Sequence, residues 1–146
     1  MMDDAKEPAI IPYDDGMRQD VVALWDACGL TRPWNDPNKD IDRKLADPLG
    51  GFFVMVLDDR VIGSVMAGYD GHRGAIYYLS VDPQHQSAGY GRQLMDHCEA
   101  FLIGQGCPKI NLFVRHGNEA VKKFYQDLGY SEETAVPFGK RLIPDI

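Results

Sequence analysis

The chain has 146 residues, of which 45% are hydrophobic and 25% are charged, an ordinary globular composition that predicts one domain over residues 1–146. Its formal net charge of −7 argues against nucleic acid or an anionic membrane as a partner and modestly favours a cationic substrate, although the simpler interpretation is that the charge only keeps the protein in solution. No apolar stretch approaches the ~18 residues of a membrane span, and the N-terminus has neither the basic start nor the apolar run of an export leader, so we expect a cytoplasmic protein.

The first half of the chain predicts a strand, two helices and a β-hairpin. Turn residues at 14–16 offer a cap for the first helix, and Gly29 ends it. A proline-rich loop follows at 30–38, and the pair Asp58-Asp59 makes the tight turn of the hairpin. The expected elements are the strand 9–13, a helix that reaches Cys28, the short helix 40–46, and the paired strands 52–57 and 60–69.

The second half alternates strands and helices. Its clearest element is an amphipathic helix after residue 91, because apolar residues recur there at helical spacing: Leu94, Met95, Cys98, Phe101 and Leu102. The other expected elements are the strand 75–81, the loop 84–91, the strand 110–114, a helix 119–128 closed by Gly129, and two strands, 130–134 and 137–143, that could close the sheet. This order predicts an α/β (α+β) fold with mixed strand directions.

A loop with two glycines joins the strand 75–81 to the amphipathic helix. The start of a helix exposes unpaired N–H groups and the positive end of the dipole, which together bind phosphate. Gly89 and Gly91 lack a Cβ, so the backbone can approach a diphosphate closely, and Arg92 adds a positive charge. Alone, this pattern is equally well explained by a glycine-eased turn without a ligand. The third glycine of a dinucleotide-binding fingerprint and the Gly-Lys-Ser/Thr of a P-loop are both absent.

A second pattern lies in the last predicted helix. Asn118 is a natural N-cap, and Tyr125 follows seven residues later, so both side chains lie on similar sides of the helix. Alone, this pattern is better explained by a capped helix with an aromatic core residue.

Together and in this order, the two patterns resemble the GCN5-related N-acetyltransferase (GNAT) superfamily. Its acetyl-CoA signature, Gln/Arg-x-x-Gly-x-Gly/Ala, is matched by Gln86, Gly89 and Gly91. Its later helix commonly carries an Asn and a Tyr before a Gly-Phe/Tyr ending, which is matched by Asn118, Tyr125, Gly129 and Tyr130. Further segments are similar to the bacterial YpeA-like group, which is related to the ribosomal-protein N-terminal acetyltransferases: 32–37, 68–74 and 106–110.

The resemblance implies a GNAT fold, with a central mixed, mostly antiparallel sheet of about seven strands flanked by about four helices. It implies an enzyme that transfers the acetyl group of its co-substrate acetyl-CoA to a primary amine by direct attack. Tyr125 would protonate the departing thiolate as general acid. The residues implied for the donor site are Leu79, Ser80, Val81, Gln86, Ser87, Ala88, Gly89, Tyr90, Gly91, Arg92 and Asn118. Dimers are common among relatives, so a homodimer stays open.

Two departures from the family pattern concern the chemistry. Many members have Gly and then Arg or Lys after the first motif residue, where this chain has Ser87 and Ala88. Many also carry a Glu on the strand before the loop, whereas 75–81 holds no carboxylate. A missing base favours an easily deprotonated amine, such as a protein N-terminus with a pKa of ~7.8 rather than a lysine at ~10.4. A base acting through water could still come from Asp70, His72, Tyr77 or Glu119.

The acceptor wall is expected in loops and strands with conspicuous aromatic, Asp and His side chains: Trp34, Asp70, His72 and Tyr77. The simpler interpretation is that Trp34 only packs its loop onto the core. Two other functions stay open, a small-molecule acetyltransferase for a polyamine, antibiotic or amino acid, and a non-catalytic acetyl-CoA-binding module. No metal site is expected, because the 3 cysteines and 4 histidines lack ligand spacing.

Overall fold

The computed structural model describes residues 6–145. The N-terminal stretch in which the sequence predicts no export leader includes residues 1–5, which lie outside the described residues. The elements are β1 (Ala9–Pro12), α1 (Arg18–Ala27), α2 (Pro37–Leu45), β2 (Phe52–Leu57), β3 (Arg60–Tyr69), β4 (Gly74–Val81), α3 (Tyr90–Gly104), β5 (Ile110–Asn111) and α4 (Glu119–Asp127), with short 3₁₀ helices at Asp15–Met17 and Pro83–His85. Across residues 6–145, no helix is long and apolar enough to cross a membrane.

One five-stranded sheet runs through the protein in the order β1-β2-β3-β4-β5. All neighbouring strands are antiparallel except β4 and β5, which are parallel. The predicted hairpin is confirmed with both of its boundaries, and Asp58 and Asp59 adopt the positive φ angles, 51° and 61°, that a two-residue hairpin turn favours. The expected mixed, mostly antiparallel α/β fold is therefore confirmed.

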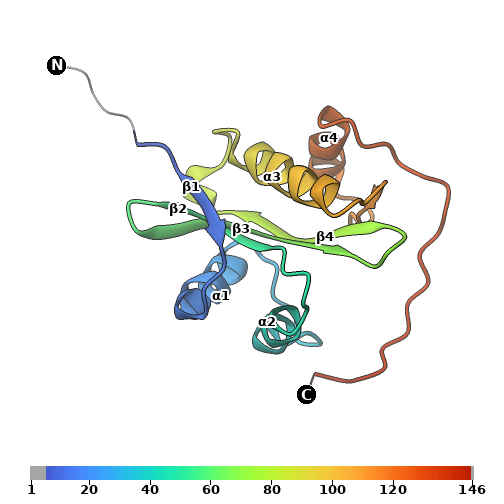
Figure 1. The fold of residues 1–146 in the computed structure, drawn as a ribbon, viewed down its shortest axis with the longest axis horizontal. Coiled ribbons are helices and arrows are strands. Elements are labelled where there is room, and N and C mark those ends of the chain that lie inside the picture. The colour runs from blue at the N-terminus through green and yellow to red at the C-terminus, as the bar shows by residue number, and fades with distance from the viewer. Residues whose placement is uncertain (1–5, 146) are drawn as a thin grey trace.

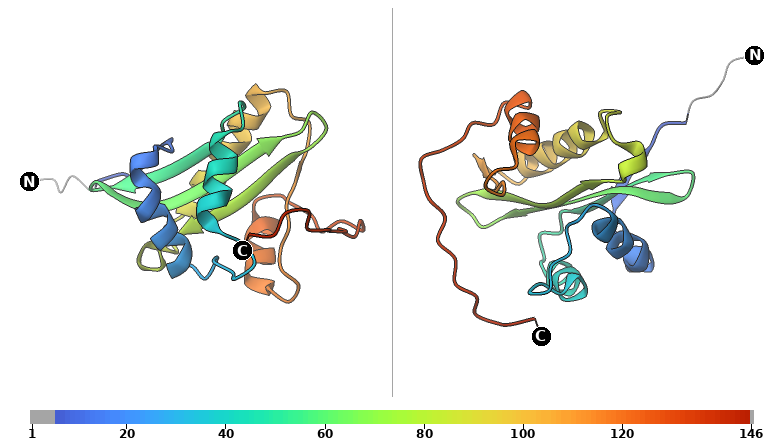
Figure 2. Two further views of the ribbon diagram at one scale, coloured as in Figure 1. Left: turned by 90° about the horizontal axis from the view of Figure 1, so that it is seen from below. Right: turned by 180° about the vertical axis from the view of Figure 1, so that it is seen from behind.

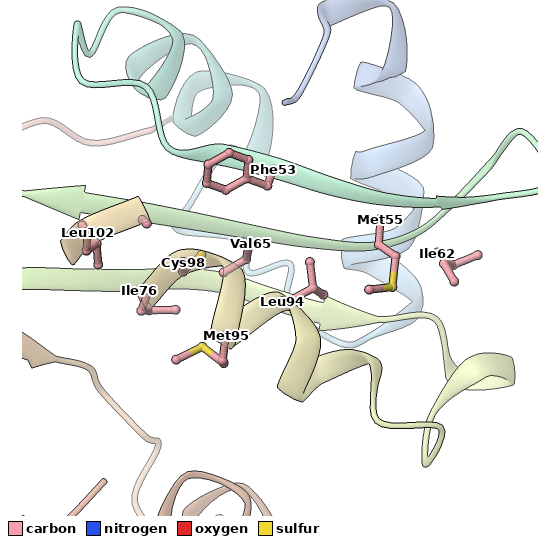
Figure 3. Packing of buried hydrophobic residues seen from close by; sticks show 10 residues of the cluster. Phe53, Met55, Ile62, Val65, Ile76, Leu94, Met95, Cys98 and Leu102 are labelled. Carbon is pink, nitrogen blue, oxygen red and sulfur yellow. The ribbon is translucent and has the colours of Figure 1, made fainter. Parts of the chain in front are cut away.

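Helices cover both faces of the sheet (Figure 1, Figure 2): α3 and α4 lie on one face, and α1 and α2 lie on the other. The central strands must be apolar on both faces, which is why β2 reads as a continuous apolar run. The buried residues between the sheet and α3 include Met55, Ile62, Val65, Ile76, Leu94, Met95, Cys98 and Leu102 (Figure 3). The core on the other face is made by Val21, Leu24, Trp25, Ile41, Phe52, Val54 and Met66.

Helix α2 begins at Pro37, earlier than the predicted residue 40. Asp36 caps this helix, because its side chain accepts hydrogen bonds from the N–H groups of Asn38 at 2.9 Å and Lys39 at 3.4 Å. A proline is tolerated in the first turn, where its missing N–H has no helical partner. The predicted loop 30–38 therefore ends where its last proline starts the helix.

The expectation of about seven strands is wrong, since the described residues form five. Strand β5 spans only Ile110–Asn111, and the predicted strands 130–134 and 137–143 are not formed. A β-prone segment becomes a strand only against a paired neighbour. Here the C-terminal segment instead runs from α4 around the sheet toward α2 (Figure 1), and Asp145 pairs with Arg43 at 2.7 Å. Its large apolar side chains are exposed: Val136, Phe138, Leu142 and Ile143.

Candidate active site

Strand β4 leaves much of its outer edge unpaired. It pairs with β5 only at Gly74 and Ala75, so beyond them this edge faces no strand formed by residues 6–145. Just past the strand, the N–H of Asp82 donates to a carbonyl of β3 at 2.7 Å. Successive N–H groups of a strand point to opposite edges, so those of Leu79 and Val81 point to the unpaired edge. Two backbone donors are thus available there to a ligand.

A β-bulge precedes these two donors. The register of β3 and β4 shifts between Ser64 and Met66, so that Tyr78 and Leu79 together face one residue of β3. The extra residue breaks the regular alternation of side chains along β4, so that residues on either side of the bulge face different helices than they would in a regular strand. Leu79 packs against the core under α3, whereas Tyr78 packs against the core under α1.

The loop after β4 folds back onto the strand and leads into α3. Gln86 Nε2 donates to the Val81 carbonyl at 3.0 Å. Ser87 and Gly89 both adopt left-handed φ angles, 67° and 82°, and Gly89 is the N-cap of α3. Among the residues described, the N–H groups of 87–92 donate no hydrogen bond. These free N–H groups and the start of the helix dipole form an arrangement that binds anions.

The charge at this helix start is also favourable. Arg92 is exposed and forms no ion pair with any residue in the range 6–145. Ala88, where many family members carry a basic side chain, is also exposed. Arg92 is therefore a free positive charge in the first turn of α3.

The two glycines of the loop have different structural roles. A Cβ at position 89 would meet no atom within 4 Å, so steric contact does not require a glycine there. The left-handed φ angle does, because glycine adopts it without strain. At Gly91 a Cβ would lie only 3.2 Å from the ring of Phe124. Gly91 therefore lets the first turn of α3 pack closely against α4. The sequence interpretation, which considered a close approach to a diphosphate or an eased turn, missed this contact between the helices.

Helix α4 carries Tyr125 about two turns after Asn118, and the N-cap predicted at Asn118 is confirmed. Asn118 is the N-cap, and its side-chain oxygen accepts from the N–H of Val121 at 3.3 Å. Tyr125 packs against the core under α3 and contacts the ring of Tyr130 edge-on, with centroids 5.7 Å apart. Burial, together with the nearby Cys98, raises the pKa of Tyr125 to about 12. Its hydroxyl donates no hydrogen bond within residues 6–145, so its proton is free for a ligand.

Two of the four predicted acceptor residues lie on the face of the sheet opposite α3. Trp34 lies in the connection between α1 and α2 and is 52% exposed. Tyr77 is 51% exposed and alternates with Ile76, which is buried under α3, so its ring faces the α1–α2 side. Both aromatic rings are accessible to an acceptor that approaches from that side.

The other two, Asp70 and His72, lie at the opposite end of β4. They belong to the turn between β3 and β4, about 16 Å along the strand from Leu79. The Asp70 carboxylate accepts hydrogen bonds from the N–H groups of His72 and Arg73, both at 2.8 Å, and these bonds hold its pKa below the ordinary value. The structure does not bring Asp70 or His72 to the unpaired edge. Glu119, the remaining candidate base, is a largely exposed residue in the first turn of α4.

Sequence reasoning missed Tyr78 and the residues that hold it. The Tyr78 hydroxyl donates to the Asp40 carboxylate of α2 at 2.6 Å, and its ring stacks on Trp25 of α1 with centroids 3.8 Å apart. No local signal distinguishes Tyr78 from Tyr77 beside it, because the bulge that separates their environments depends on long-range pairing. Across residues 6–145, no group of three or more His, Cys, Asp or Glu side chains is placed to hold a metal ion.

Comparison of the sequence and the fold with known proteins identifies a family. The model of the acetyltransferase (GNAT) family matches residues 18–130. An acetyltransferase of Sodalis glossinidius (strain morsitans) is 48% identical over 140 residues, which cover 95% of this chain and 97% of that protein. Solved AAC(6')-Iy in complex with the bisubstrate analogue CoA-S-monomethyl-acetylneamine has a TM-score of 0.76 at 18% identity, covering 93% of this chain and 99% of that one. The ribosomal-protein-S18-alanine N-acetyltransferase of Escherichia coli has a TM-score of 0.75 at 19% identity, covering 88% and 80%. At these identities the two solved structures show the fold alone.

Proposed function

The chain belongs to the acetyltransferase (GNAT) family, and on that premise we propose that it transfers the acetyl group of acetyl-CoA to a primary amine by direct attack. The observation that carries this proposal is the unpaired edge of β4, which leads directly into the free N–H groups at the start of α3. One end of this path suits a diphosphate, and the other offers backbone donors to a thioester. The fold neighbour AAC(6')-Iy is solved with a CoA-based analogue, which supports the same class of donor here.

The donor would lie along this path. The N–H groups of 87–92 and the guanidinium of Arg92 would hold the diphosphate, and Gln86 would fix the loop through its bond to Val81. The pantetheine arm would follow Leu79, Ser80 and Val81, with Tyr90, Gly91 and Asn118 bordering it. An N–H of Leu79 or Val81 would then stabilise the oxyanion that forms when the thioester carbonyl is attacked.

The reaction would need little more than alignment and one proton donor. Holding the amine and the thioester together supplies much of the rate, because it removes the entropy of bringing them together. The CoA thiolate leaves as the amide forms, and Tyr125 would protonate it. Because burial keeps the pKa of Tyr125 at about 12, the phenol is protonated throughout the neutral range.

The acceptor we propose is the α-amine of a protein N-terminus. Strand β4 carries no carboxylate that could deprotonate an amine at the thioester. An α-amine, with a pKa of ~7.8, is neutral in roughly a seventh of molecules at pH 7, whereas a lysine at ~10.4 is neutral in fewer than about one in a thousand. Trp34 and Tyr77 would form the wall against which the acceptor rests.

A small-molecule amine is the second candidate. Both AAC(6')-Iy and the ribosomal-protein-S18-alanine enzyme share this fold at similar TM-scores, so the fold does not favour either class of acceptor. A third candidate is a module that binds acetyl-CoA without catalysis; such a protein would bind the donor and acetylate no acceptor. A homodimer and a cytoplasmic location stay predictions from the sequence.

The first test is calorimetric titration with acetyl-CoA on the wild-type protein and two charge-reversal variants. Arg92→Glu should weaken binding about tenfold or more, because it places a carboxylate beside the diphosphate. Arg60→Glu is the matched control: Arg60 is exposed at the β2–β3 turn, and the variant changes net charge by the same amount. A folded wild-type protein that does not bind acetyl-CoA would remove the proposal.

The acceptor class is tested by turnover on matched peptides. One peptide has a free α-amine and no lysine, and the other has a blocked N-terminus and one lysine; an aminoglycoside and a polyamine complete the panel. We expect the free α-amine to react fastest. Faster turnover of the lysine peptide would contradict the argument from the missing carboxylate, and turnover of the aminoglycoside or polyamine alone would favour the second candidate.

A further inference from the structure

Tyr78 has a backbone conformation that its surroundings must enforce. Its φ angle is +55°, a region that bulky side chains avoid. The other non-glycine residues with positive φ between residues 6 and 145 are Asp58, Asp59 and Ser87, and all three lie in turns or loops. Tyr78 alone has this conformation inside a strand, at the bulge that directly precedes Leu79. A strained conformation persists only where neighbouring contacts determine it, and such positions are concentrated at functional sites.

Three contacts hold Tyr78, and each comes from a different element. Its ring stacks on Trp25 of α1 at a centroid distance of 3.8 Å and an interplanar angle of 14°. Its hydroxyl donates to the carboxylate of Asp40 in α2 at 2.6 Å. Its carbonyl accepts from the hydroxyl of Ser64 in β3 at 2.8 Å. We call these four residues the Tyr78 clamp.

The clamp is itself rigid. Trp25 and Ser64 are both fully buried, and Trp25 Nε1 donates to Ser64 Oγ at 2.8 Å. The ring and the carbonyl of Tyr78 are therefore fixed by two residues that are bonded to each other. The one contact made by a less buried partner is the bond to Asp40, which also pairs with Arg43 at 3.1 Å.

The geometry points to Tyr78 as a positioning residue for acetyl transfer: by fixing the bulge, it aims the N–H of Leu79 at the unpaired edge where the thioester carbonyl would bind. This inference rests on the proposed function. Tyr78 itself packs on the α1–α2 side and its peptide bond leads into Leu79, which packs on the α3 side. Loosening the ring or the hydroxyl would let the bulge rotate and turn the Leu79 N–H away from the carbonyl.

The test is a spectroscopic signature of the carbonyl contact. Acetyl-CoA labelled with ¹³C at the thioester carbonyl is bound to each protein, and the carbonyl band is recorded by infrared difference spectroscopy. A hydrogen bond from the edge moves this band to lower frequency than in water-dissolved acetyl-CoA. We expect the shift in the wild type, a smaller shift in Tyr78→Phe and Asp40→Ala, and recovery in Asp40→Asn, whose amide oxygen still accepts from the Tyr78 hydroxyl.

The control is another tyrosine with the same two kinds of contact. The Tyr13 ring stacks on Phe52 with centroids 4.2 Å apart, and its hydroxyl donates to the Asp15 carboxylate at 2.9 Å. Tyr13 follows β1, however, which forms the opposite edge of the sheet from β4 and β5. Tyr13→Phe should keep the full carbonyl shift at a comparable loss of thermal stability. With the fastest acceptor of the panel, kcat of Tyr78→Phe should fall about 10-fold to 100-fold, the size of loss that a small misplacement produces, while KM for acetyl-CoA changes less than about threefold.

Failure of this inference is distinguishable from failure of the proposed function. A wild-type protein that binds no acetyl-CoA contradicts the proposed function. Binding with an unshifted band in the wild type, or with the same shift in Tyr78→Phe as in the wild type, overturns the positioning role alone. An equal loss of the shift in Tyr13→Phe would overturn it too, since general loss of stability would then explain the effect.

Discussion

Removing the hydroxyl of Tyr125 should lower kcat by a factor that stays constant across the neutral pH range. The variant is Tyr125→Phe, which keeps the ring that packs against the core and Tyr130 and removes only the proposed proton donor. Burial holds the pKa of this phenol at about 12, so in the wild type it remains protonated from neutral pH up to about pH 11. The contribution of the phenol to the rate should therefore not change with pH below that value.

The expected size follows from the charge that the departing sulfur carries. A phenol that is protonated at every pH from 7 to 9 donates its proton equally well throughout this range. General acid catalysis by a positioned side chain typically contributes about 10²-fold to 10⁴-fold, and the low end applies here, because a thiol with a pKa of ~8.5 is a good leaving group. The ratio of wild-type to Tyr125→Phe kcat should accordingly be about 10 to 100 and should stay constant from pH 7 to pH 9. Titration of the acceptor amine cancels in this ratio.

The assay is steady-state release of CoA thiol at five pH values with one acceptor and saturating acetyl-CoA. Tyr130→Phe is the matched control, because it removes a neighbouring hydroxyl that donates to Glu99 of α3 at 2.7 Å and leaves the proposed proton donor in place. A ratio for Tyr125→Phe close to 1 at all five pH values would refute the general-acid role and leave Tyr125 as a packing residue. An equal loss of kcat in Tyr130→Phe would refute it as well.

Three further predictions concern the packing around the site. Gly91→Ala should lower the free energy of unfolding by about 1–3 kcal/mol, because the new Cβ would meet the Phe124 ring at 3.2 Å; urea denaturation should show that Phe124→Leu in the same chain recovers part of the loss. Ser87→Gly should raise that free energy by about 0.5 kcal/mol, because glycine accepts the φ angle of 67° without strain, and calorimetry should show unchanged acetyl-CoA affinity. Cys98 should resist a thiol reagent at pH 8 until the protein unfolds, because it is fully buried and burial raises its pKa to about 12; labelling of Cys98 in the native protein, seen by mass spectrometry, would contradict this.

The parts of the fold that depend on local pattern could be predicted from the sequence. The hairpin of β2 and β3 follows from two β-prone runs and the turn residues between them, and its boundaries agree with the structure. Helix α3 follows from apolar residues at helical spacing, and four of these are buried: Leu94, Met95, Cys98 and Leu102. In both cases the signal lies within about fifteen residues of chain, the length over which periodicity acts.

The parts that depend on a distant partner could not be predicted in this way. The segment 137–143 has the composition of a strand, yet Phe138 is 97% exposed and the segment forms no strand pairing between residues 6 and 145. Its available neighbour, β5, offers a ladder of only two residues. Composition measures how well a residue suits a pleated surface, but the presence of that surface is decided by the rest of the fold.

The candidate site likewise has a part that local sequence predicts and a part that depends on distant contacts. The donor loop lies in one continuous stretch, 86–92, so its chemistry and its place at a strand-to-helix turn are visible together in the sequence. The chemistry of Asp70 and His72 predicts acceptor residues, but both lie beyond the far end of β4, a strand of eight residues whose two ends are widely separated. Chemical type alone does not indicate at which end of a strand a residue acts.

The two faces of the sheet contribute differently to the proposed reaction, and only one of them carries a family signature. The α3–α4 side carries the anion-binding loop and Tyr125, which match that signature in two separate segments. The α1–α2 side carries the exposed ring of Trp34, the proposed wall for the acceptor, and the residues that hold Tyr78 for the donor thioester; no local motif marks either. A shared signature can therefore indicate the donor while leaving the acceptor free to differ between relatives, and the acceptor has to be established by measuring turnover and by substitutions at Trp34 and Tyr77.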